Sequence, residues 1–178
     1  MAEVAEAKAQ VVDGARREAD AYRGEAPQPL GGYLAVLMIY GVVVAAATAA
    51  ALLTGRTLPP RWRIQDLVLV TLGTHKLSRT VTKDAVTSPL RAPFTRYVGT
   101  GGPAEVKEEV RDESQLRHSL GELLTCPFCL DMWVATGFAI GLVFAPRFTR
   151  LIAGVFTALA GADFLQLGYA MAQKSAEG

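Results

Sequence analysis

The chain's only two cysteines, Cys126 and Cys129, form a C-x-x-C motif where a charged segment gives way to an apolar one. Two thiols at this spacing can form and break a disulfide, and a helix start stabilises the thiolate that does so. The same pair could also bind zinc together with His75 and His118, the only histidines of the chain. In a third interpretation both thiols are reduced and buried, and Pro127 starts a helix.

These three interpretations make different demands on the rest of the chain. A membrane redox relay uses a second cysteine pair, which this sequence lacks, and a reducing compartment disfavours a stable disulfide. A zinc site would require both histidines to converge on the cysteines, or two chains to share the metal. The sequence therefore favours the structural interpretation, with no cofactor, and leaves the other two open.

A carboxylate, Asp163, lies well inside the last apolar segment. Such a group is costly in lipid and usually faces a charged partner or a water-filled cavity. At 1.5 Å per residue, Asp163 and the basic residues His75, Lys76 and Arg79 lie at a similar depth, roughly 18–24 Å from one end of their segments. We therefore expect Asp163 to pair with one of these three bases and to join the two segments.

The apolar residues that must position these groups gather in long runs between charged segments, which is typical of helices in lipid. The sequence predicts an all-α integral membrane protein of four, alternatively three, transmembrane helices in two hairpins. Three would result if the second helix lies at the interface. The predicted helices cover residues 33–53, 64–81, 129–145 and 148–171.

Polar segments flank and separate these helices. Residues 1–32 predict a polar, partly disordered arm that is broken at residues 24–29, and residues 33–178 form the membrane domain. The central loop, about residues 82–128, is first basic and then acidic, and its first part contains two prolines that prevent a long helix. Its basic part could bind anionic headgroups or pair with its acidic part. Residues 114–124 predict a short amphipathic helix that leads into the cysteines.

Gly137 and Gly141 form a G-x-x-x-G pattern inside the third predicted helix. Two glycines at this spacing let helix backbones approach closely in lipid. We expect both residues to line a helix–helix contact.

The distribution of basic residues predicts an orientation. With four spans, the N-terminus, the central loop and the C-terminus share a side, and that side carries most of the lysines and arginines. The positive-inside rule places it in the cytoplasm of a multi-pass protein of the bacterial cell membrane. The net charge of +1 gives no general attraction to nucleic acid. The expected partners are the lipid bilayer and a protein partner or further copies of the chain.

Three stretches carry a family resemblance: His75–Arg79 with Asp84, Val86–Phe94, and Gly121–Cys129 with Trp133. In this order they resemble a family of small bacterial membrane proteins catalogued as domain of unknown function 1360, over roughly residues 64–145. The resemblance implies no established activity. It marks five positions of this chain, which are Arg79, Asp84, Arg91, Cys126 and Cys129.

The sequence thus favours a non-catalytic membrane scaffold or interaction protein. The alternative is a membrane thiol–disulfide oxidoreductase that uses Cys126 and Cys129, and the third hypothesis is a zinc-stabilised membrane protein. The candidate structural or functional residues are Arg79, Asp84, Arg91 and Asp163.

Overall fold

The computed structural model describes residues 1–24, 28–59, 61–111 and 113–177. Most of them are helical. The elements in chain order are α1 (Ala2–Arg23), α2 (Leu30–Leu53), α3 (Ile64–Lys83), η1 (Ala85–Thr87), α4 (Ser88–Arg91), β1 (Thr95–Thr100), β2 (Val106–Val110), α5 (Gln115–Thr125), α6 (Pro127–Phe144) and α7 (Pro146–Glu177).

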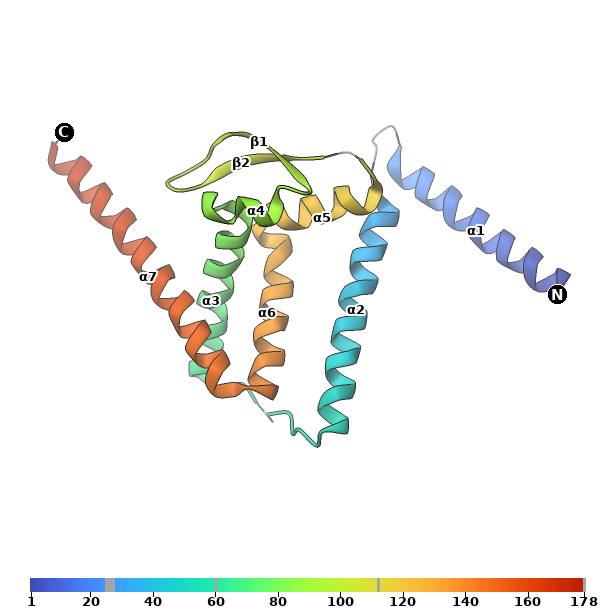
Figure 1. Cartoon of the computed structure of the whole chain (residues 1–178), viewed down its shortest axis with the longest axis horizontal. Coiled ribbons are helices and arrows are strands. Elements are labelled where there is room, and N and C mark those ends of the chain that lie inside the picture. Colours follow the sequence, from blue (N-terminus) through green and yellow to red (C-terminus); the bar gives the residue numbers. More distant parts are fainter. Residues whose placement is uncertain (25–27, 60, 112, 178) are drawn as a thin grey trace.

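Helices α2, α3, α6 and α7 extend from one end of the molecule to the other, and the chain alternates in direction from α2 to α3 and from α6 to α7 (Figure 1). Between α3 and α6, the elements η1, α4, β1, β2 and α5 form a polar cap at one end (Figure 1). Helix α3 packs mainly on α6 and α7, whereas α2 packs mainly on α5 of the cap. The molecule is therefore a closely packed group of three helices with α2 attached at its cap end.

Within the described ranges, three helices are long and apolar enough to cross a membrane: α2, α6 and α7. The four predicted segments coincide with α2, α3, α6 and α7, although α7 continues to Glu177. Helix α3 carries charged residues along its length and falls outside the three candidates.

The central segment, predicted as a loop, contains two strands as well as helices. Strands β1 and β2 pair antiparallel, with Thr95 opposite Val110 and Thr100 opposite Val106. Their β-branched residues favour an extended chain. At the turn, Ala104 has a positive φ of 62°, and Gly101 lies close to Glu105, where a Cβ would be 3.1 Å from the Glu105 Cβ. The all-α prediction was thus incomplete here, but the predicted amphipathic helix is present as α5. Its start is capped by the Ser114 hydroxyl, which accepts the Arg117 N–H at 3.3 Å.

The N-terminal segment, predicted as a polar arm, is helical in the structure. Helix α1 has 22 residues, and their side chains are mostly exposed. Of the break predicted at residues 24–29, residues 25–27 lie outside the described part of the chain.

The apolar core lies between α3, α6 and α7. Val70, Phe138 and Ala153, one from each helix, are its buried centre. Gly73 permits the close approach of α3 to α7, because a Cβ there would lie 3.2 Å from the Ala153 carbonyl oxygen.

Candidate functional site

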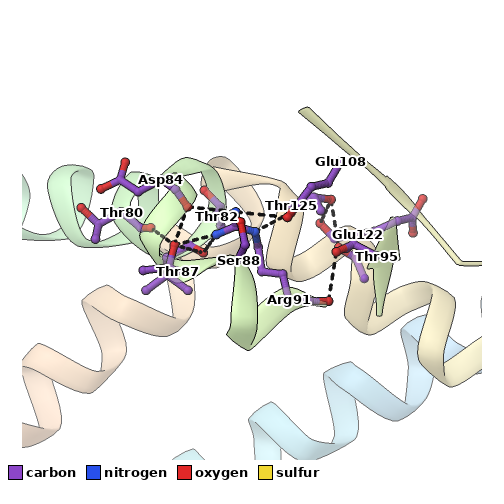
Figure 2. A network of polar contacts seen from close by, with 12 residues as sticks. Thr80, Thr82, Asp84, Thr87, Ser88, Arg91, Thr95, Glu108, Glu122 and Thr125 are labelled. Atoms are coloured by element: carbon purple, nitrogen blue, oxygen red, sulfur yellow. Dashed lines mark hydrogen bonds and ion pairs between the residues drawn. The ribbon is translucent and has the colours of Figure 1, made fainter. Parts of the chain in front are cut away.

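The junction between α3 and the cap is organised by Arg91, whose side chain is completely buried (Figure 2). Its guanidinium donates to the Val81 carbonyl at 2.6 Å, the Thr87 hydroxyl at 2.7 Å and the Asp84 carbonyl at 3.0 Å. It also forms an ion pair with Glu108 of β2, through Nε to Oε2 and through Nη2 to Oε1 at 3.3 Å. Arg91 thus satisfies carbonyls at the end of α3 and ties β2 to that end.

Arg79 and Asp84, which the family motifs also mark, lie at the same junction. Arg79 forms an ion pair with Glu105 beside the start of β2. Asp84 contributes its backbone carbonyl to Arg91, and its backbone also forms an isolated β-bridge with Glu105. The structure therefore brings Arg79, Asp84 and Arg91 together, in contacts that hold the cap on α3.

Two ion pairs join α3 to α7. Lys76 Nζ lies 2.7 Å from Asp163 Oδ2, which confirms the expected pairing of Asp163 with a base of the second helix. The Lys76 side chain is 16% exposed and that of Asp163 is 48% exposed, so this pair is only half buried. His75 instead stacks on Phe164, with ring centroids 6.2 Å apart.

The second ion pair lies nearer the starts of both helices and was not predicted. Arg150 Nε and Nη2 donate to the two carboxylate oxygens of Asp66, at 2.7 and 2.8 Å. Asp66 is only 6% exposed. The sequence did hold a signal, because Asp66 and Arg150 are opposite charges within the first turns of two segments that start from the same side.

Helix α3 is also joined to α6 by a buried polar contact that the sequence analysis missed. The fully buried Ser78 hydroxyl contacts Asp131 Oδ1 and lies 2.6 Å from the Thr74 carbonyl. Asp131 was visible in the sequence as a lone charge near the start of an apolar segment. Nothing in its spacing pointed to Ser78.

The cysteines lie at the start of α6, just before Asp131. Cys126 is the N-cap residue and its Sγ accepts the Cys129 N–H at 3.2 Å, while Pro127 occupies the first helical turn as expected. Both thiols are free. Cys126 is half-buried, but Cys129 is exposed, so the expectation of two buried cysteines is wrong for Cys129.

The zinc hypothesis requires ligands that the fold does not gather. Among the described residues, no three or more His, Cys, Asp or Glu side chains form a group that could hold a metal ion. His75 stacks on Phe164 between α3 and α7, and His118 Nε2 lies 3.5 Å from Glu122 Oε1 on α5. His75, His118, Cys126 and Cys129 therefore do not form one site within a single chain.

A pocket of about 630 Å³ lies between α2, α5 and α6, and both cysteines line it. At its polar end are Ser119 and Glu122 of α5, while its walls are apolar and aromatic side chains of α2 and α6. The Ser119 hydroxyl and Glu122 Oε2 are buried and have no hydrogen-bond partner in the described part of the chain. Sequence reasoning missed this pocket, because no spacing rule brings α2 to α5.

The two glycines of the G-x-x-x-G pattern have different surroundings. At Gly141 a Cβ would lie 2.5 Å from Thr149 Oγ1, so this glycine lets α6 and α7 approach closely, as expected. A Cβ at Gly137 would meet nothing within 4 Å, so the expectation for Gly137 is wrong within one chain.

Comparison with known proteins identifies the family and nothing beyond it. The model of the family described as "Protein of unknown function (DUF1360)" matches residues 69–169, from α3 through most of α7. No curated protein and no solved structure matches the chain. The matched segment includes the cap, both cysteines and, apart from Asp66, the residues of the two ion pairs between α3 and α7. It begins later and ends later than the roughly 64–145 expected from the motifs. Because it covers more than half of the chain, this protein belongs to the DUF1360 family.

Proposed function

We propose that this protein is a non-catalytic scaffold or interaction protein of the bacterial cell membrane. Its membrane unit comprises α2, α3, α6 and α7, with the cap and both termini in the cytoplasm. Its partners are lipid together with another membrane protein or further copies of the chain, and not nucleic acid.

One observation carries the proposal: both arginines marked by the family motifs form ion pairs within the chain. Arg91 is fully buried and pairs with Glu108, and Arg79 pairs with Glu105. A catalytic group must instead reach a substrate within hydrogen-bond distance. Residues with these contacts stabilise the cap, which is the role expected in a scaffold.

The same contacts support α3 as a fourth crossing helix, although its composition alone does not. Charged side chains are tolerated at membrane depth when they pair within the protein. Asp66 pairs with Arg150, and Lys76 pairs with Asp163, in each case across to the apolar helix α7. These pairs reduce the cost of placing α3 beside α6 and α7 in lipid.

The orientation can be tested with two matched single-cysteine variants. In a background with Cys126→Ser and Cys129→Ser, Lys107→Cys places a thiol on the exposed face of β2, and Thr57→Cys places one in the loop between α2 and α3. An impermeant maleimide added to intact cells should label Thr57→Cys, and should label Lys107→Cys only after permeabilisation. The reverse pattern would show that the cap faces outwards.

The interaction role can be tested with a photo-crosslinking residue on α2. Ile39 is exposed on this helix, whereas Phe138 is buried in the core. Irradiation in cells should join the Ile39 variant to a second protein or a second copy, and the Phe138 variant should give no such product. Protein adducts absent from Ile39 and from the neighbouring exposed positions Met38 and Val42 would argue against an interaction role for α2.

A second candidate function is thiol–disulfide exchange, because both thiols are free, Cys129 is exposed and both line one pocket. In such a reaction the two thiols would lose two protons and two electrons to a partner's disulfide, which would become two thiols. Thiol titration of purified protein with and without reductant tests this candidate, and metal analysis of the same sample tests the zinc hypothesis. A thiol content that reductant does not change, in protein purified under non-reducing conditions, would favour the scaffold.

A further inference from the structure

The pocket between α2, α5 and α6 has the construction of a site for an amphiphilic molecule. Its volume, about 630 Å³, lies within the range of small-molecule sites. Val36 and Leu37 of α2 and Met132 of α6 contribute apolar walls. Ser119 and Glu122 contribute polar atoms at the end next to the cap. A ligand that fits both parts has an apolar body and a polar head.

The inner end of the pocket is closed by an aromatic pair. Tyr40 of α2 and Trp133 of α6 both line the pocket and contact each other edge to face, with ring centroids 5.2 Å apart. The Tyr40 hydroxyl is also hydrogen-bonded to the Thr136 hydroxyl at 2.9 Å. Tyr40 lies seven positions after Tyr33, so the pocket reaches about 10 Å along the helices from the cap.

One polar group at this end lacks a hydrogen-bond partner. Ser119 is 2% exposed, lines the pocket, and its hydroxyl has no partner among the described residues. The Glu122 side chain is 39% exposed, one of its oxygens lies 3.5 Å from His118 Nε2, and the Tyr33 side chain of the pocket wall interacts with its carboxylate. Glu122 thus adds a negative charge beside the unpartnered Ser119 hydroxyl. Buried polar groups in native structures are nearly always paired, and an unpaired one costs about 1–3 kcal/mol. A bound ligand would supply the missing contact.

The charge at this end selects the ligand's head. A carboxylate oxygen only accepts hydrogen bonds, and a serine hydroxyl can accept as well. A primary ammonium donates three hydrogen bonds and carries the opposite charge, so it matches both groups at once. A quaternary ammonium has the charge but no N–H to donate.

We propose that this pocket binds a bilayer lipid with a primary-ammonium headgroup, of the ethanolamine class. Its ammonium lies against Glu122 and Ser119, and part of its apolar chain lies between α2 and α6 above the Tyr40–Trp133 contact. This inference rests on the proposed membrane location. It adds the class of lipid that the α2 side of the protein recognises.

Trp133 provides a reporter inside the pocket. The chain has two tryptophans, and Trp62→Phe leaves Trp133 alone. The full chain is reconstituted in phosphatidylcholine vesicles that contain a minor fraction of brominated phosphatidylethanolamine or of brominated phosphatidylcholine. We expect stronger quenching by the brominated ethanolamine lipid, and a fall in quenching as the ammonium is successively methylated. Equal quenching across this series would overturn the proposal without use of any pocket variant.

Two controls separate the pocket from general lipid effects. Glu122→Gln should abolish the preference for the ethanolamine lipid, whereas Glu109→Gln, on the exposed face of β2, should keep it. Trp133→Phe leaves Trp62, in the loop between α2 and α3, which should show no preference. The same preference at Trp62 would mean general lipid selectivity and would contradict a pocket.

The experiment also separates this inference from the membrane location on which it rests. Quenching of Trp133 by both brominated lipids to the same extent keeps the membrane location and rejects the headgroup selectivity. No quenching of Trp133 by any brominated lipid rejects both.

Discussion

The α3 side of the molecule, meaning α3 with the elements packed on it, and the α2 side differ in how their buried charged groups are paired. On the α3 side the buried charges have partners: Asp66 pairs with Arg150 of α7 and, at the junction with the cap, Arg91 of α4 pairs with Glu108 of β2. The Thr74 hydroxyl of α3 is nevertheless buried without a hydrogen-bond partner in the described chain, as are the Ser119 hydroxyl and Glu122 Oε2 on the α2 side. Paired buried groups make an arrangement rigid and specific, whereas unpaired ones leave a site that a ligand can complete. The comparison indicates that the paired charges around α3 stabilise the fold, whereas the pocket beside α2 can bind a ligand.

The largest loss of stability is expected from a change of Arg91, because its ion pair is the most buried one in the described chain. Arg91→Gln removes the charge that faces Glu108 and leaves the carbonyls at the end of α3 without donors. Breaking such a buried pair should lower the free energy of unfolding by about 3–5 kcal/mol. Thermal unfolding in detergent measures the loss, and Arg96→Gln, at an exposed position of β1, is the matched control. Equal stability of the two variants would show that Arg91 does not stabilise the fold.

The pair between Lys76 and Asp163 should have a smaller effect, because Asp163 is 48% exposed. Asp163→Asn and Lys76→Met should each destabilise by an amount between the 0–1 kcal/mol of an exposed pair and the about 3–5 kcal/mol of a buried one. The double variant should lose less than the sum of the two single variants. Unfolding measurements on all four proteins test this, and strictly additive losses would show that the pair does not hold α3 to α7.

The two glycines of α6 give a prediction about packing rather than charge. Gly141→Leu forces side-chain atoms into Thr149 of α7 and should cost about 1–3 kcal/mol of stability, as overpacking typically does. Gly137→Leu meets open space within the chain and should leave the monomer's stability unchanged. Melting temperatures in detergent compare the two. Destabilisation by Gly137→Leu would instead reveal a contact between copies of the chain.

The smallest expected difference in stability is between variants of two buried serines, Ser78 of α3 and Ser119 of α5. Ser78→Ala removes a hydroxyl that contacts Asp131 and should cost about 1 kcal/mol or more. Ser119→Ala removes a hydroxyl that has no partner in the described chain, so the lipid-free protein should keep or slightly gain stability. Unfolding in a lipid-free detergent should show this difference, and a larger loss for Ser119→Ala would contradict the comparison.

The sequence predicted the helices well because apolar runs between charged segments constrain a membrane protein strongly. The Asp163 pairing followed from depth alone, since 1.5 Å per residue fixes where a charge lies along a helix. The rotation of a helix about its axis was harder, and this is why Gly137 and Cys129 were placed wrongly. To place either residue, one must know which face of α6 points into the protein. The sequence does not tell this, because both faces of α6 are apolar.

The cap and the pocket escaped prediction for a different reason. Glu108 contacts Arg91 only because β2 folds back over α4. A two-stranded hairpin is hard to recognise in a charged segment of sequence. Ser119 and Glu122 meet α2 because Gly32 is buried against the Gln115 backbone, where a Cβ would lie 2.1 Å from the carbonyl oxygen. Such contacts depend on tertiary packing rather than on periodicity.

The two pairs between α3 and α7 have a consequence for biogenesis. In the proposed topology, α3 leaves the ribosome with Asp66 and Lys76 exposed, whereas Arg150 and Asp163 are made only with the last helix. A helix with unpaired charges partitions poorly into lipid on its own. Stable insertion of α3 therefore waits for α7, and a nascent chain that stops after α6 leaves α3 at the translocon or the interface. In that topology, assembly is complete only once the last helix, α7, has been made.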